Sequence, residues 1–134
     1  MSLQSRLSDL ITAIGTDYKA LVAAIALKVD KAQTINAQTG TSYTFVLTDD
    51  SKLVTLSNAS AITLTVPINS SVAFPVGTHI DLVQIGAGQV TVTQTGGVTV
   101  NAAPSKLFRA QYSAATLIKL ATDTWVLVGD LETP

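Results

Sequence analysis

The first thirty residues place apolar side chains at the spacing of an α-helix. Successive apolar positions are separated by 4, 3, 4, 4, 3, 4 and 4 residues, which puts them on one helical face. Ser2 is the expected N-cap, and the pattern ends near Lys31 to Gln33, before a polar stretch that starts at Thr34. We predict that this apolar stripe mediates oligomerisation through Leu3, Leu7, Leu10, Ile14, Tyr18, Leu21, Ile25 and Val29.

This helix is too long to be covered by its own chain. From Leu3 to Lys31 it would extend roughly 43 Å, whereas a head of about 100 residues has a radius of gyration of about 13 Å. The stripe contains an eleven-residue repeat, which predicts a nearly straight or weakly right-handed bundle, unlike a heptad coil. Further apolar residues at Ile11, Val22 and Leu27 widen the stripe and favour three or more helices.

A helical hairpin is the alternative interpretation of this segment. Gly15 is a suitable C′ residue for a first short helix, and Thr16 or Asp17 is a suitable N-cap for a second. The apolar phase nevertheless continues through Gly15 without a shift, which a hairpin would not require. One continuous helix is therefore the prediction.

From Tyr43 onward the apolar period falls to two. Leu53–Leu56, Ile62–Val66 and Gln89–Thr93 alternate apolar with hydroxylic residues, as half-buried strands do. The chain holds 11 Ser and 19 Thr, a composition that favours strands and turns. Strands are predicted at 43–48, 52–57, 61–66, 79–85, 89–95, 98–101, 107–112, 115–121 and 124–129.

Short turn sequences separate these strands. They lie at 49–51, 58–60, 86–88, 96–97 and 123–124. Such turns between alternating runs are typical of β-hairpins, so we predict antiparallel pairing in a meander or small sandwich. The longest link, 67–77, contains two prolines that exclude a central strand, and it is the candidate contact loop. The predicted organisation is a helical oligomerisation stalk at 1–35 and a β head at 36–134.

Composition excludes several classes of function. The chain has no cysteine, so it has neither disulfides nor zinc-thiolate sites. Its net charge is -1 and it lacks a cluster of Lys or Arg, which argues against nucleic-acid binding. The helical segment carries charges throughout, so membrane insertion is not expected, and no secretory signal is evident.

Charged residues are unevenly distributed along the chain. Residues 1–35 carry seven of them, which leaves ten for residues 36–134. An ordinary domain is about 25% charged, so the second segment is short of the residues that normally cover a monomer. We therefore expect part of the head surface to be buried against other copies of the chain.

Residues that carry chemistry are few. His79 is the single histidine, and we interpret it as a strand residue opposite Asp81 and Val83, because no nucleophile motif accompanies it. Asp49 and Asp50 would suit a calcium loop or a glycosidase carboxylate pair, but adjacent acids at a turn are more typical of solvated turn formers. We predict no enzymatic activity, no catalytic or metal-binding residue and no cofactor.

The aromatic residues, one Trp, three Tyr and three Phe, allow two interpretations. Exposed on a β head, they would stack on sugars as in a lectin, but a domain of this size needs most of them in its core. Trp125 is assigned to the core for this reason, and no receptor-binding residue is identified. The candidates considered are Trp125, Tyr112, Phe108, Tyr43 and Phe45.

Several segments resemble proteins of bacteriophage virions. The stretch 7–21 is similar to stalk segments that precede fibre domains in minor tail and tail-fibre proteins, and 70–78, 84–92 and 122–131 resemble a β domain of phage virion fibres. The resemblance implies a homotrimer located in the virion and synthesised in the host cytoplasm, with its stalk bound to other virion proteins. It also implies adhesion to a glycan or protein of the host cell surface, and it brings no catalytic residues.

The predicted fold class is mainly β with an N-terminal α-helical coiled coil and an antiparallel β sandwich or meander head, in a trimeric fibre. Two other functions remain as alternatives. A purely structural capsid fibre or decoration protein would have the same architecture without a receptor. A fibre-borne hydrolase would need clustered acids, which the head sequence lacks.

Overall fold

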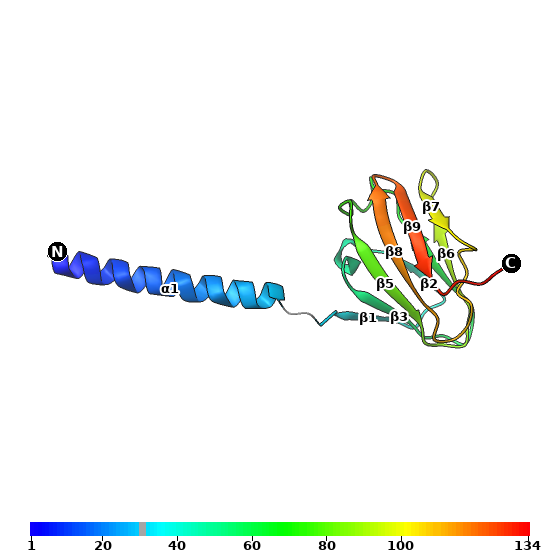
Figure 1. The fold of residues 1–134 in the computed structure, drawn as a ribbon, viewed down its shortest axis with the longest axis horizontal. Helices are drawn as coiled ribbons and strands as arrows, with labels where there is room; N and C mark the ends of the chain where they lie inside the picture. Colours follow the sequence, from blue (N-terminus) through cyan, green and yellow to red (C-terminus); the bar gives the residue numbers. More distant parts are fainter. Residues whose placement is uncertain (30–31) are drawn as a thin grey trace. The chain divides into compact units, whose positions relative to one another are not determined.

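The structure is a computed structural model of the chain and describes residues 1–29 and 32–134 (Figure 1). The chain forms two compact units, residues 1–32 and 33–134. The first unit contains helix α1, and the second contains all the described strands.

The N-terminal unit is one uninterrupted helix, α1, which spans Leu3–Val29. The Ser5 amide donates to Ser2 Oγ at 3.1 Å, which confirms Ser2 as the N-cap. The helix continues through Gly15, so the alternative of a helical hairpin is wrong. The predicted coiled coil is not evident, because α1 is a single helix, and the predicted end near Lys31 lies outside the described residues.

The β head contains two sheets. The larger sheet has the strand order β1-β3-β5-β8-β9-β7, and the smaller has the order β2-β4-β6. A short 3-10 helix, η1, precedes β3. The bounds are β1 Ile35–Gln38, β2 Ser42–Thr44, η1 Leu47–Asp49, β3 Leu53–Leu56, β4 Ile62–Val66, β5 His79–Gln84, β6 Val90–Gln94, β7 Thr99–Ala102, β8 Ala114–Ala121 and β9 Thr124–Gly129.

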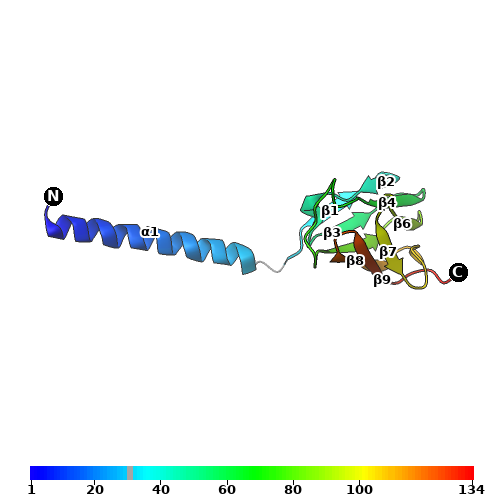
Figure 2. The same cartoon turned by 90° about the horizontal axis from the view of Figure 1, so that it is seen from above.

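Parallel pairing dominates both sheets. β1, β3 and β5 are parallel neighbours in the larger sheet, and β2, β4 and β6 are parallel neighbours in the smaller one. The chain thus winds through three successive coils, β1–β2, β3–β4 and β5–β6, and each coil contributes one strand to each sheet. This is a β-solenoid-like arrangement (Figure 2). The predicted antiparallel sandwich or meander is therefore wrong. Among the predicted hairpins, the one at 123–124 is confirmed, because β8 and β9 pair antiparallel there.

The glycine-rich segment 86–88 is a corner between successive turns and not the end of a hairpin. The Gly88 amide donates to the carbonyl of Asn58 on the preceding turn at 2.9 Å. A Cβ at Gly88 would lie 1.8 Å from the carbonyl oxygen of Ser60. Glycine is required here because one corner packs closely on the next. A corner and a hairpin use similar residues, which explains why the turn sequences suggested antiparallel pairing.

Three segments differ from the predicted strands. In the predicted strand 43–48, only 43 and 44 lie in β2, whereas 47 and 48 lie in η1. β1 is absent from the prediction because its inward positions, Asn36 and Gln38, are polar and break the apolar alternation. The segment 107–112 is not a strand, since Leu107 and Phe108 form isolated bridges there. Leu107 pairs with Thr91 of β6, and Phe108 pairs with Leu131 near the C-terminus.

The apolar core of the head lies between the two sheets. The Trp125 ring meets the Phe74 ring edge-on, with their centroids 5.5 Å apart. Inward side chains of successive strands stack in register around this pair, because parallel neighbours repeat the same alternation. The largest fully buried apolar side chains are Trp125, Phe45, Phe108, Leu56, Ile62, Leu64, Ile80, Leu82, Leu117 and Leu127.

Candidate functional site

The apolar stripe of α1 is uncovered. Every residue from 1 to 26 is exposed, and each described side chain of the stripe has more than half of its surface open to solvent. Because α1 is continuous, the helical repeat brings these side chains to one face. The side chains of Leu27 and Val29 lie outside the described residues. The described members of the stripe are Leu3, Leu7, Leu10, Ile14, Tyr18, Leu21 and Ile25.

Asp49 lies at the centre of a buried polar network in the head. Its carboxylate is fully buried and accepts hydrogen bonds from the Tyr43 hydroxyl and from the Asn36 side-chain amide, each at 2.8 Å. The backbone amide of Val46 donates to the same carboxylate at 2.9 Å. The prediction of a solvated turn residue is therefore wrong for Asp49. Its side chain is buried in the head and hydrogen-bonded there.

The phenol of Tyr43 strongly resists ionisation within this network. Burial raises the pKa of Tyr43 to about 12, together with the hydrogen bond to Asp49 and its negative charge, whereas the hydrogen bond from Asn36 acts in the opposite direction. A phenol with such a pKa is a poor acid or base near neutral pH. The network therefore supports the fold and offers no catalytic pair.

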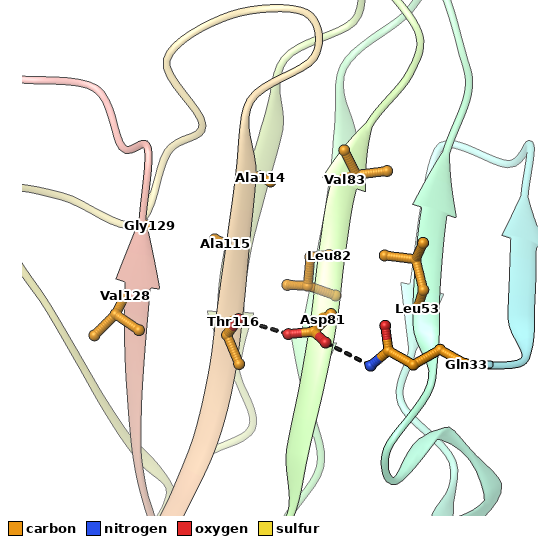
Figure 3. A pocket seen from close by; sticks show the side chains of 10 residues that line it. All are labelled: Gln33, Leu53, Asp81, Leu82, Val83, Ala114, Ala115, Thr116, Val128 and Gly129. Atoms are coloured by element: carbon orange, nitrogen blue, oxygen red, sulfur yellow. Dashed lines mark hydrogen bonds between the residues drawn. The ribbon is translucent and has the colours of Figure 1, made fainter. Parts of the chain in front are cut away.

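Asp81 is the carboxylate on the outer face of the larger sheet. Its two oxygens accept hydrogen bonds from Thr116 Oγ1 and from Gln33 Nε2, each at 2.6 Å (Figure 3). Burial raises the pKa of Asp81, but the two hydrogen bonds and the neighbouring His79 lower it more, so it lies below its ordinary value. His79 opens β5 on the same face as Asp81 and Val83, which confirms its prediction as a strand residue.

An open pocket of about 390 Å³ surrounds Asp81 (Figure 3). Aliphatic side chains such as Leu53, Val83 and Val128 form much of its wall, and no aromatic residue lines it. Both oxygens of Asp81 are already hydrogen-bonded within the head, and the described lining residues include no second carboxylate. Among these residues the pocket therefore has neither the carboxylate pair of a glycosidase nor a ring on which a sugar could stack.

Most aromatic candidates belong to the core. Trp125, Phe45 and Phe108 are buried, and Tyr43 is committed to the Asp49 network. Tyr112 differs from them because it is 70% exposed and has a φ of 68°, in the left-handed region that favours glycine. Of the five candidates, Tyr112 is the one that is placed to touch a ligand or partner.

The predicted contact loop at 67–77 is anchored by a buried lysine. Lys119 on β8 donates from Nζ to Asn69 Oδ1 at 2.5 Å and to the Phe74 carbonyl at 2.6 Å. The same ammonium lies 5.7 Å from the centroid of the Trp125 ring, a cation–π contact. Sequence reasoning missed this residue, although the alternation of Ala115, Leu117 and Lys119 along β8 points all three inward.

Other kinds of site were sought in the same residues. Within 1–29 and 32–134, no helix has the length and apolarity of a membrane span. The described residues also contain no group of three or more potential ligands placed to hold a metal ion. A scan of protein-family models and a search of curated proteins find no match to this chain. The exposed apolar stripe of α1 is the candidate surface that extends along the whole described helix.

Proposed function

We propose that this chain is the subunit of a homotrimeric bacteriophage fibre, whose helices associate through the stripe and whose β heads adhere to the host cell surface. The observation that carries the proposal is the row of exposed apolar side chains along the whole described length of α1. The resemblance of 7–21 to phage stalk segments supports the viral assignment. The width of the stripe, extended by Ile11 and Val22, favours three helices over two.

The energetics favour association of the helices. Full burial of a Leu or Ile side chain contributes about 1.5 to 3 kcal/mol relative to full exposure. The described stripe residues are 52% to 82% exposed, so burial of that exposed part would contribute roughly 6 to 13 kcal/mol per chain. Association costs about 4 to 15 kcal/mol in lost translational and rotational freedom. The gain and the cost are of similar size, so the stripe supports association. Packing of an apolar face is also the main source of stability for an amphipathic helix in a protein.

Light scattering of the purified full chain tests the oligomer. We expect a mass three times 13.9 kDa. Ile14→Lys, in the middle of the stripe, should convert this species to monomer at the same concentration. Ala23→Lys is the matched control, because nine residues turn an α-helix by about 180° from the direction of Ile14. A monomeric wild-type chain, or equal effects of the two variants, would contradict the proposed trimer.

Adhesion in this proposal is multivalent. Three heads on one trimer act at high effective concentration, so a weak contact per head suffices. Tyr112 is a suitable contact because an exposed aromatic ring stacks on the apolar face of a sugar. We expect saturable binding of the fluorescently labelled chain to host cells, with a loss in Tyr112→Ala. Val76→Ala, an exposed position in the 67–77 loop, tests the other candidate contact.

A purely structural virion part is the second candidate function. It is favoured by the burial of Trp125, Phe45 and Phe108, which leaves the head with few exposed aromatic groups for a receptor. The same binding experiment separates the two functions. Binding to virions without binding to host cells would favour a decoration protein, whereas saturable binding to cells favours adhesion.

A further inference from the structure

The two sheets of the head have outer faces of opposite character. All the outward positions of the smaller sheet are hydroxylic, and they lie in register across its parallel strands. Hydroxyl groups are well solvated, so this face is suited to water. The outward residues are Ser42 and Thr44 on β2, Thr63 and Thr65 on β4, and Thr91 and Thr93 on β6.

The outer face of the larger sheet combines aliphatic side chains with polar ones, among them Thr55, Thr99, Asn101 and Thr124. One row across its strands contains Ile35, Leu53, Asp81, Thr116 and Val128 in register. Figure 3 shows two aliphatic members of this row, Leu53 and Val128, on either side of Asp81. Adjacent rows add further aliphatic groups, and this surface is called the aliphatic face below. Its apolar residues are Ile35, Ala37, Leu53, Val83, Ala114, Ile118, Leu120, Val126 and Val128.

We propose that a second copy of this chain covers the aliphatic face, so that the heads as well as the helices contact one another in the assembly. This inference rests on the proposed function, since the helices must first bring the copies together. The smaller sheet provides an internal comparison. Strands of both sheets alternate inward and outward positions. The outward positions of the smaller sheet are hydroxylic, whereas many of those in the larger sheet are aliphatic.

The charges on the aliphatic face favour a copy of the same chain as its occupant. His79 and Asp81 are the ionisable strand residues of this face, and Asp81 already receives hydrogen bonds from Thr116 and Gln33. Both donors are neutral, so Asp81 keeps its single negative charge, and the face offers no cluster of charges that would select a strongly basic or acidic partner. A nearly neutral aliphatic surface is complementary to another of the same kind.

The connection between the units allows this contact to be weak. The described helix reaches Val29 and β1 begins at Ile35, so few residues separate the helix from the head along the chain. Short flexible tethers give effective concentrations in the millimolar range, and linked contacts can exceed the affinity of a single contact by about 10² to 10⁴. Contacts between heads that would not form in isolation are therefore expected to form in the assembled chain.

Thiol labelling tests the occupant of the aliphatic face. The natural chain has no cysteine, so a single introduced cysteine reports one position. Val128→Cys probes the aliphatic face, where Val128 is 46% exposed in the single chain, and Thr63→Cys probes the outer face of the smaller sheet. In the full-length assembled protein we expect the thiol at 128 to react at least about tenfold more slowly than the thiol at 63. Ala114→Cys gives a second probe of the same face if the first variant folds poorly.

Light scattering of the same samples separates this inference from the proposed function. Protection at 128 that disappears when Ile14→Lys dissociates the chain would support a second copy as the cover. Equal reactivity of the two probes in a trimer would overturn the inference and leave the trimer intact. Protection at 128 in a monomer would assign the cover to the chain's own helix and overturn both. Equal reactivity of the thiols at 128 and 63 in a monomeric protein would overturn both the head contact and the proposed trimer.

Discussion

The hydroxyl of Tyr43 donates to Oδ2 of Asp49 at 2.8 Å, and this contact joins β2 to η1. Both β1 and β2 are edge strands, so the network lies where the two sheets begin. A buried carboxylate is tolerated when hydrogen bonds replace its hydration. The Tyr43 hydroxyl therefore helps to close the core at the end of the head that is least covered by neighbouring strands.

Removal of this hydroxyl should destabilise the head. Tyr43→Phe keeps the ring, which packs edge-on against Phe45, but leaves Asp49 with one donor fewer. We expect a loss of about 1 to 3 kcal/mol in the free energy of unfolding, measured by urea denaturation. Tyr112→Phe is the matched control, because Tyr112 is exposed and loss of its hydroxyl should change the free energy of unfolding very little. Equal stabilities of the two variants would show that the buried contact contributes nothing.

Stability should also fall at alkaline pH because of Tyr43. Its pKa is about 12 in the folded chain, against an ordinary value of 10.0. Between these values the unfolded tyrosine loses its proton while the folded one keeps it, so rising pH favours the unfolded state. The stabilisation is fully present below pH 10 and is lost as the pH rises through 12. Urea midpoints across this range should decline less steeply in Tyr43→Phe, and parallel declines would contradict the assignment.

The buried ammonium of Lys119 should hold the 67–77 loop. Lys119→Met preserves most of the side-chain volume but removes the donor to Asn69 and Phe74. We expect a loss of about 1 to 3 kcal/mol in stability, with faster hydrogen exchange in residues 69–77. Lys106→Met is the control, since Lys106 donates to Gln94 at an exposed position. Unchanged exchange in the loop would mean that other contacts anchor it.

Hydrophobic periodicity predicted most elements of the chain but could not predict how they pair. The steps of three and four before Val29 identify α1, and the period of two identifies strands such as β4 and β6. A period of two is the same for parallel and antiparallel neighbours, so the pattern carries no information about strand direction. The direction depends on where each corner packs, as at Gly88 against Asn58, which is a contact between distant residues.

The polar interior was harder to predict than the apolar one. From the sequence, Asp49 was predicted to be a solvated turn residue and Asn36 was placed in no strand, because polar side chains are usually solvated. In the structure they satisfy each other with a hydrogen bond of 2.8 Å, and this pairing requires β1 and η1 to be brought together by the fold. Lys119 is different, because its inward position follows from the alternation along β8 and was available in the sequence.

The close stacking of corners gives the sharpest test of the solenoid-like arrangement. Gly88→Ala would place a Cβ 1.8 Å from the Ser60 carbonyl oxygen, so one corner must shift away from the next. We expect a loss of about 3 kcal/mol or more in stability, followed by the fluorescence of buried Trp125 during urea denaturation. Gly96→Ala is the matched control, because nothing lies within 4 Å of the added Cβ, and it should change stability by less than about 0.5 kcal/mol. In an antiparallel meander position 88 would sit at a free hairpin end, so similar small effects at both glycines would argue against stacked corners.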